Sequence, residues 1–148
     1  MSIRTHTLWT LVVAMIVLLY VFAPFSWFVQ LDSIEYSDIC VGDTKQIVTS
    51  NRHAIWDING EAKTLLVFYS DDNLRIETDI RRSSTFTYES DIEHVEFELE
   101  WDKPITRVGT YGVQSTETIY PFWFMPVRTF HAPETRLFQV FNVIDCDL

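Results

Sequence analysis

The sequence predicts an all-β fold, an antiparallel β-sandwich of immunoglobulin-like size, preceded by one N-terminal transmembrane α-helix. Residues 8–29 contain no charged side chain. Seven or eight strand-like segments follow, with turn signals about 8–12 residues apart. No helical period occurs after residue 30, and residues 31–148 have the length of one domain. A small barrel is the alternative arrangement of these strands.

The first element is the apolar segment Leu8 to Val29, which is long enough as a helix to cross the roughly 30 Å hydrocarbon core of a bilayer. Trp9 and Trp27 would lie about 27 Å apart on this helix. Aromatic rings at that spacing favour the two headgroup zones, so we expect Trp9, Trp27 and Phe28 at the membrane interfaces.

The orientation follows from the charges that flank this segment. Arg4 precedes it, whereas Asp32, Glu35 and Asp38 all come before the next basic residue, Lys45. Basic residues stay on the cytoplasmic side, so residues 1–7 are expected in the cytoplasm and residues 31–148 outside it.

A cleaved signal peptide is the main alternative to a retained anchor. Its best cleavage site would follow Ala23, but Pro24 comes directly after it and disfavours cleavage. A buried or interfacial helix is the remaining alternative.

The first half of the domain shows two turn signals between strand-like segments. Residues 31–41 alternate loosely and predict an opening strand, which ends at a turn at Gly42-Asp43. Residues 45–58 and 62–70 predict two strands, and Asn59-Gly60 between them is a strong turn dipeptide. We therefore expect these two strands to pair as a hairpin.

The second half contains the clearest strand pattern. A turn at residues 71–73 leads to a strand over 74–78, and residues 81–84 are polar and predict a loop before a short strand with Phe86 and Tyr88. In residues 93–102, Val95, Phe97, Leu99 and Trp101 alternate with charged or polar residues, as in a strand with one buried face. Residues 136–145 predict the last strand.

The composition limits the classes of partner. The net charge of −10 excludes nucleic acid, which needs basic groups on the protein. The two cysteines, Cys40 and Cys146, are expected to form a disulfide that ties the first strand to the last, because an exported domain meets an oxidising compartment. Trp56 follows Cys40 at an immunoglobulin-like spacing, but Cys146 lies at the C-terminus instead of on the penultimate strand.

Motifs of catalysis and of metal or cofactor binding are missing from the sequence. The four histidines are dispersed, and no nucleophile elbow, P-loop or zinc-ligand spacing occurs. We expect no cofactor and no metal. The acidic row Glu96, Glu98, Glu100 and Asp102 predicts a solvated face paired with arginines; a calcium site shared with residues 71–73 is the alternative.

Aromatic residues are concentrated in residues 118–130, together with Pro121 and Pro126. Prolines confine such a segment to a sheet edge or an ordered loop. Because aromatic residues and methionine are enriched at interfaces, we expect this segment to bind a partner or to enter the bilayer, with a core-closing plug as the alternative. The candidate partner-binding residues are Tyr120, Phe122, Trp123, Phe124 and Met125.

Three functional hypotheses follow. The first is a single-pass membrane protein whose exported β-domain is a non-catalytic binding or assembly module in a membrane or envelope complex. The second is an accessory subunit of a channel, transporter or secretion complex that contacts its partners through the helix. The third, an exported enzyme, is disfavoured. Residues 8–29 would contact lipid, a protein partner is expected, and homo- and hetero-oligomers both stay open.

Overall fold

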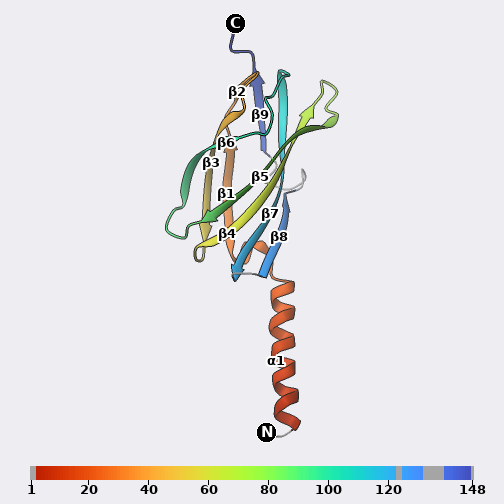
Figure 1. Ribbon diagram of the computed structural model, residues 1–148, viewed down its shortest axis with the longest axis vertical. Coiled ribbons are helices and arrows are strands. Elements are labelled where there is room, and N and C mark those ends of the chain that lie inside the picture. The colour runs from red at the N-terminus through yellow and green to blue at the C-terminus, as the bar shows by residue number, and fades with distance from the viewer. Residues whose placement is uncertain (1–2, 123–124, 132–138, 148) are drawn as a thin grey trace.

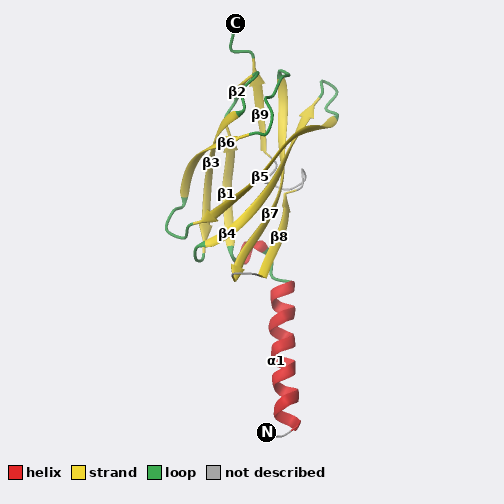
Figure 2. Cartoon of the chain, in the orientation of Figure 1, coloured by secondary structure: helices red, strands yellow, loops and turns green. Residues whose placement is uncertain are grey.

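The computed structural model describes residues 3–122, 125–131 and 139–147, and it consists of one N-terminal helix and two β-sheets (Figures 1 and 2). The helix projects from one end of an elongated β-domain, and the C-terminus lies at the opposite end. This mostly-β architecture with one apolar N-terminal helix is the architecture that the sequence predicts.

Helix α1 comprises Ile3–Val21, so it begins and ends earlier than the predicted segment 8–29. Pro24 explains the early end, because proline lacks an N–H donor and disfavours helical conformation in the residue before it. The chain then forms a short 3₁₀ turn, η1 (Phe25–Trp27), and enters β1 at Val29. Nineteen helical residues span about 29 Å, close to the thickness of a hydrocarbon core.

The helix has a mean hydropathy of 1.6, and none of this segment is buried against the β-domain. These properties fit a membrane anchor, and they also fit a signal sequence near an N-terminus.

The strands are divided into a three-stranded and a six-stranded sheet. The smaller sheet has the order β1-β3-β6 and is antiparallel, with β1 Val29–Tyr36, β3 Lys45–Ala54 and β6 His94–Glu100. The larger sheet has the order β2-β9-β7-β4-β5, and β8 pairs with β7. Its strands are β2 Ile39–Cys40, β4 Ile58–Tyr69, β5 Arg75–Tyr88, β7 Gly109–Phe122, β8 Met125–His131 and β9 Gln139–Ile144.

The hairpin predicted around Asn59-Gly60 is wrong. Both residues lie inside β4, and β3 and β4 belong to different sheets. Gly60 is paired on both sides, with Phe86 and with Ile119, so pairing and packing override its turn propensity. The chain reverses just before β4 instead, where Asp57 Oδ1 accepts hydrogen bonds from the backbone N–H and the hydroxyl of Ser90.

Two further predictions need correction. Residues 81–84 form part of β5 and not a loop. The sheets are not wholly antiparallel, because β2 and β9 pair in parallel. The turn at residues 71–73 is confirmed between β4 and β5, with Asn73 at a φ of 57°. The alternation in β6 is also confirmed, since Leu99 and Trp101 are buried and the glutamates are exposed.

The apolar core consists of two separate clusters. The distal cluster draws residues from both sheets, including Val48, Leu99, Leu66, Val113 and Phe141. The proximal cluster, at the helix end, includes Ala23, Phe28, Ala54, Ile58 and Ile119. Because Ala23 and Phe28 belong to this cluster, the folded domain begins before the predicted boundary at residue 31.

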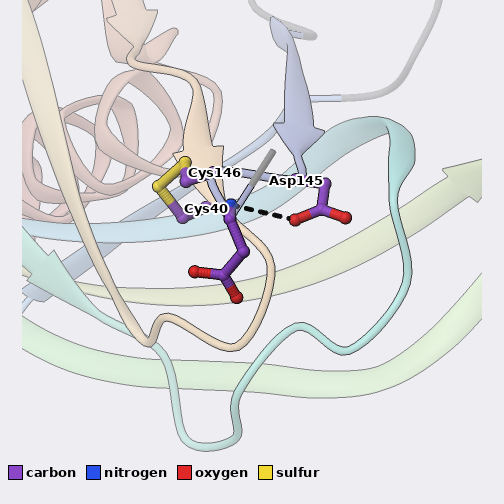
Figure 3. The surroundings of a disulfide bond; sticks show 4 residues. Cys40, Asp145 and Cys146 are labelled. Carbon is purple, nitrogen blue, oxygen red and sulfur yellow. Dashed lines mark hydrogen bonds between the residues drawn. A yellow bond between two sulfur atoms is a disulfide. The ribbon is translucent and has the colours of Figure 1, made fainter.

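Cys40 and Cys146 form a disulfide, with their Cα atoms 5.5 Å apart (Figure 3). Cys40 ends β2 and Cys146 follows β9, so the bond joins neighbouring strands of one sheet at the end of the domain opposite the helix. An immunoglobulin disulfide instead bridges two sheets around a buried tryptophan. Trp56 lies in the bend before β4 with 39% of its surface exposed, so the immunoglobulin-like spacing has no counterpart in the structure.

Candidate functional site

The end of the domain from which α1 projects carries a cluster of aromatic rings. Phe122 lies at its centre, with ring centroids 5.7 Å from Tyr20, 6.0 Å from Phe28 and 5.5 Å from Trp56. Trp56 also donates a hydrogen bond from Nε1 to the carbonyl of Pro121 at 3.0 Å. These contacts join the last turn of α1, the η1 turn, the bend before β4 and the end of β7.

The junction between helix and domain is folded. Phe28 and Val29 are buried, and the carbonyl of Phe28 accepts a hydrogen bond from the backbone N–H of Ile55 at 3.1 Å. The N–H groups of Ala23 and Trp27 are also bonded within the junction, to the carbonyls of Tyr20 and Pro24. No extended linker therefore separates α1 from the sheets.

An apolar rim surrounds this junction. Large side chains that remain exposed lie in the turn between α1 and Pro24, on η1, on the bend before β4 and at the end of β7. They are Phe22, Trp27, Ile55, Trp56 and Phe122. An exposed aromatic group of this kind is typical of a protein or membrane contact.

One of the candidate partner-binding residues, Phe122, belongs to this apolar rim. Tyr120 and Phe122 lie at the end of β7, and Phe122 is 46% exposed. Met125 begins β8 opposite Phe122. Trp123 and Phe124 lie outside the described residues. The structure therefore places the predicted segment at the helix end of the domain. The prediction of a sheet edge is wrong for residues 118–120, which lie on β7 between β4 and β8, and it applies only to β8.

The three residues expected at membrane interfaces have different surroundings. Trp9 lies on α1 and Trp27 on η1, and each is 58% exposed. Trp27 lines a small apolar notch with Met15, Leu18 and Leu19 of α1, so its indole lies beside the helix. Phe28 is buried in the proximal cluster and contacts the domain.

The acidic face of β6 is solvated. Glu98 forms an ion pair with Lys45 of β3 at 2.9 Å, with both side chains more than half exposed. Of the predicted arginine partners, Arg107 instead stacks on the ring of Phe68, and Arg81 contacts Asp102 through its backbone N–H. Among the described residues, no three side chains of His, Cys, Asp or Glu converge as a metal site would require.

A second candidate site is a cavity of about 290 Å³ between the two sheets. It is lined by a belt of inward-facing polar side chains that separates the distal cluster from the proximal one. On each contributing strand the belt residues stand between apolar residues of the two clusters. They are Ser50 and Arg52 of β3, Thr64 of β4, Arg82 and Ser84 of β5, and Ser115 and Glu117 of β7.

The charged groups of the cavity lie close together. The Tyr88 hydroxyl donates a 2.7 Å hydrogen bond to Oε2 of the buried Glu117. The Arg52 guanidinium lies 4.7 Å from the centre of the Tyr88 ring. Burial raises the pKa of Tyr88, and the Glu117 carboxylate raises it further. Burial and Glu117 likewise raise the pKa of Tyr36, whereas Arg82 lowers it. These tyrosines therefore remain neutral hydrogen-bond donors at physiological pH.

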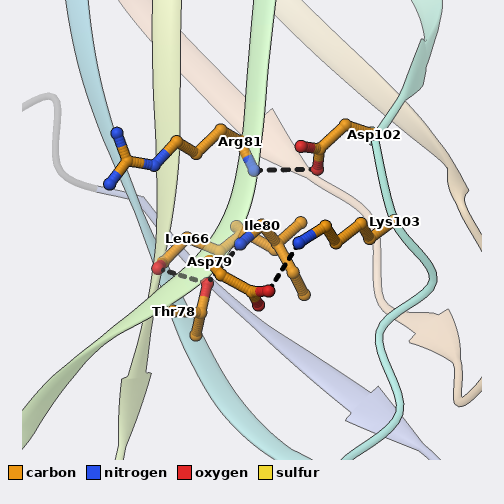
Figure 4. A network of polar contacts seen from close by, with 7 residues as sticks. All are labelled: Leu66, Thr78, Asp79, Ile80, Arg81, Asp102 and Lys103. Atoms are coloured by element: carbon orange, nitrogen blue, oxygen red, sulfur yellow. Dashed lines mark hydrogen bonds and ion pairs between the residues drawn. The ribbon is translucent and has the colours of Figure 1, made fainter.

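The edge strands of the two sheets, β5 and β6, both contribute to the cavity lining. Polar contacts tie β5 to the segment after β6 (Figure 4). The backbone N–H of Arg81 donates to Asp102 Oδ1 at 2.9 Å, and Lys103 pairs with Asp79 at 2.6 Å. These contacts hold the two edges together on the distal side of the cavity, next to the buried Ile80.

The belt residues were missed by sequence reasoning. Polar side chains at inward positions interrupt the alternation of apolar residues, so residues 81–84 predicted a loop. The available signal was the length of the uninterrupted strand-like stretch around them, from residue 75 to residue 88.

Comparison with models of known protein families and with curated proteins finds no match for this chain.

Proposed function

We propose that the chain is a single-pass membrane protein with a cytoplasmic N-terminus, whose exported domain is a non-catalytic binding or assembly module in a membrane or envelope complex. In this proposal the two sheets form a β-sandwich of immunoglobulin-like size. The disulfide supports an oxidising compartment outside the cytosol, because such bonds persist there. The helix has the length and hydropathy of an anchor.

The observation that carries this proposal is the folded junction between α1 and the domain. A chain that only needed tethering could use a polar, flexible linker. Here the helix passes into the domain core within a few residues, and aromatic rings fix the join. A rigid join holds the domain at one height and orientation above the bilayer, which favours a defined place in an assembly.

The apolar rim supplies the docking surface. Its aromatic side chains are the type enriched in the centres of protein interfaces. Since the rim surrounds the exit of α1, its partner would lie at the membrane surface. The membrane headgroups are the competing contact for the same side chains.

Cross-linking and pull-down from intact membranes test the proposal. We expect the full chain to retain a partner when residues 3–19 are replaced by an unrelated polyleucine helix that leaves Tyr20 in place on Phe122, and to lose it on Phe122→Ser with Trp27→Ser. The matched control is Val140→Ser with Ile144→Ser, which removes exposed apolar groups from β9, away from the rim.

The alternative is assembly through α1 itself. Its support is that most side chains of α1 are exposed and Tyr20, which packs on Phe122, lies in its last turn, so most of the helix surface can face lipid or another helix. Loss of the partner with the polyleucine helix, and its retention with the rim variant, would favour this alternative over the domain-driven proposal.

A further inference from the structure

The polar belt interrupts the core of the domain on four strands, and this interruption opposes stability. Apolar residues at the same inward positions would join the two clusters into one core. Polar and charged groups that are removed from water cost free energy unless they find partners. Local departures from the apolar pattern are expected at functional sites.

We infer that the cavity between the sheets is a binding site for a small organic acid, a molecule with an apolar body and one carboxylate group. The inference does not depend on the proposed assembly role. It rests on three features of the cavity: an unsatisfied donor, an excess of cationic lining groups and an apolar wall.

The unsatisfied donor is Nε of Arg52. This atom is buried and has no hydrogen-bond partner among the described residues, although Nη2 of the same side chain lies 3.5 Å from the carbonyl of Thr87. A buried donor without a partner costs about 1–3 kcal/mol. A ligand carboxylate supplies the acceptor, and a guanidinium favours a carboxylate because hydrogen bonds between two charged groups are the stronger kind.

The charge of the lining agrees with this ligand. Arg52 and Arg82 are cationic, and Glu117 is the one carboxylate of the lining. One oxygen of Glu117 already accepts the hydrogen bond from Tyr88. The negative charge of an anionic ligand would therefore balance the positive charge of the second arginine.

The remaining lining suits the apolar body. Leu31 and Ile34 of β1 and Phe97 and Leu99 of β6 lie on the smaller sheet, and Phe86 lies on β5. The volume of about 290 Å³ lies just below the range of about 300–1,000 Å³ for pockets that hold drug-sized ligands, so the ligand is small. The lining contains neither histidine nor cysteine, and we assign it binding and no reaction.

The test is a titration of the full-length chain in phosphatidylcholine nanodiscs, with amide chemical shifts measured by NMR. The probes are 3-phenylpropionate and octanoate, which share a carboxylate and differ in an aromatic or an aliphatic body. The matched neutral probe is 3-phenylpropanamide. We expect saturable shifts at belt positions of both sheets, such as Ser50 and Ser115, with at least one acid and much weaker shifts with the amide.

Variants identify the site. Arg52→Gln is expected to weaken binding of the acid by about ten- to a hundredfold, since one charged hydrogen bond is lost. Lys63→Gln removes an exposed cation from the outer face of β4 and is expected to leave binding unchanged. Ala62→Phe fills the cavity and is expected to abolish binding without loss of amide dispersion, which keeps the test valid if Arg52→Gln does not fold.

Three results would overturn the inference. One is the lack of saturable shifts with either acid up to about 10 mM, which is tenfold above a Kd of about 1 mM. The second is equal binding of acid and amide. The third is binding that survives Ala62→Phe. The relative affinity of the two acids reports whether the natural ligand has an aromatic or an aliphatic body.

Discussion

The side chain of Gln46 shows how this domain accommodates polar groups in its interior. Gln46 is buried, yet its Oε1 accepts a 3.1 Å hydrogen bond from Trp101 Nε1 and its Nε2 donates to the carbonyl of Ser37. Buried polar groups are normally paired in this way. The unpaired Nε of Arg52 therefore differs from the other buried polar groups around it.

Replacing Trp101 with phenylalanine is expected to destabilise the domain. The change removes the donor to Gln46 Oε1 and leaves a small cavity in the distal cluster. The combined cost is about 2–4 kcal/mol in the free energy of unfolding, measured by urea denaturation with near-UV circular dichroism. Trp27→Phe, at an exposed position, is the control and should change the value by less than about 0.5 kcal/mol.

Tyr88 is expected to make stability depend on pH in the alkaline range. Its pKa is raised in the folded domain by burial and by Glu117, above an unfolded value of about 10. The raised pKa favours the neutral form, so the stabilisation is complete below pH 10 and is lost as pH rises above it, by up to about 1.4 kcal/mol per pH unit.

The measurement is the free energy of unfolding at pH 8 to 11. The Tyr88→Phe variant should show a shallower decline above pH 10 than the native protein, and the same slope between pH 8 and 9. An unchanged slope above pH 10 would contradict this role for Tyr88.

Among the elements, β4 is paired along both edges, with β5 on one side and β7 on the other. Gly60 pairs with Phe86 of β5 and with Ile119 of β7. A Cβ atom at this position would lie 2.7 Å from Phe86 Cε2 and 3.1 Å from the carbonyl oxygen of Thr118. The glycine that resembles a turn signal in the sequence is therefore required for close packing.

The substitution Gly60→Ala is expected to destabilise the domain by about 1–3 kcal/mol, because Phe86 and the β7 backbone must move apart. Thermal unfolding of Gly60→Ala and of the neighbouring exposed variant Glu61→Ala gives the comparison. Equal melting temperatures for the two variants would show that the packing around Gly60 adapts without cost.

The sequence predicted those strands in which apolar and polar side chains alternate regularly. In β6 and the residue after it, Val95, Phe97, Leu99 and Trp101 face the apolar core while the residues between them face water, and this alternation was sufficient. The strand at residues 81–84 of β5 was not predicted, because both of its faces are polar. Arg81 and Ser83 face outward, whereas Arg82 and Ser84 line the cavity.

Pairing between strands was less predictable than the strands themselves. The division of β3 and β4 between two sheets and the parallel pairing of β2 with β9 depend on contacts between distant residues, which local periodicity does not encode. For the same reason the aromatic segment near Phe122 was identified from composition, whereas its contact with Tyr20 of α1 was not.

On the scale of the whole molecule, the two ends of the domain are stabilised differently. Aromatic packing joins the proximal end to α1, and the disulfide closes the distal end across a sequence separation of 106 residues. Both the first and the last parts of the chain are thereby fixed to the sheets.

Replacing both cysteines with serine is expected to lower the free energy of unfolding by about 4 kcal/mol, because the unfolded chain regains the entropy that the closed loop removes. Urea unfolding of the Cys40→Ser, Cys146→Ser double variant measures the loss, and native protein treated with a reductant provides an independent comparison. A change of less than about 0.5 kcal/mol would assign the stability of the distal end to packing alone.

The folded junction has a mechanical consequence in a bilayer. Transmembrane helices tilt by about 20° on average, and the tilt responds to the thickness of the membrane. With Tyr20 of α1 packed on Phe122 across the join, the proposed membrane helix and the elongated domain would tilt together. A small change in helix tilt would then displace the distal, disulfide-bonded end of the domain by a larger distance parallel to the membrane surface.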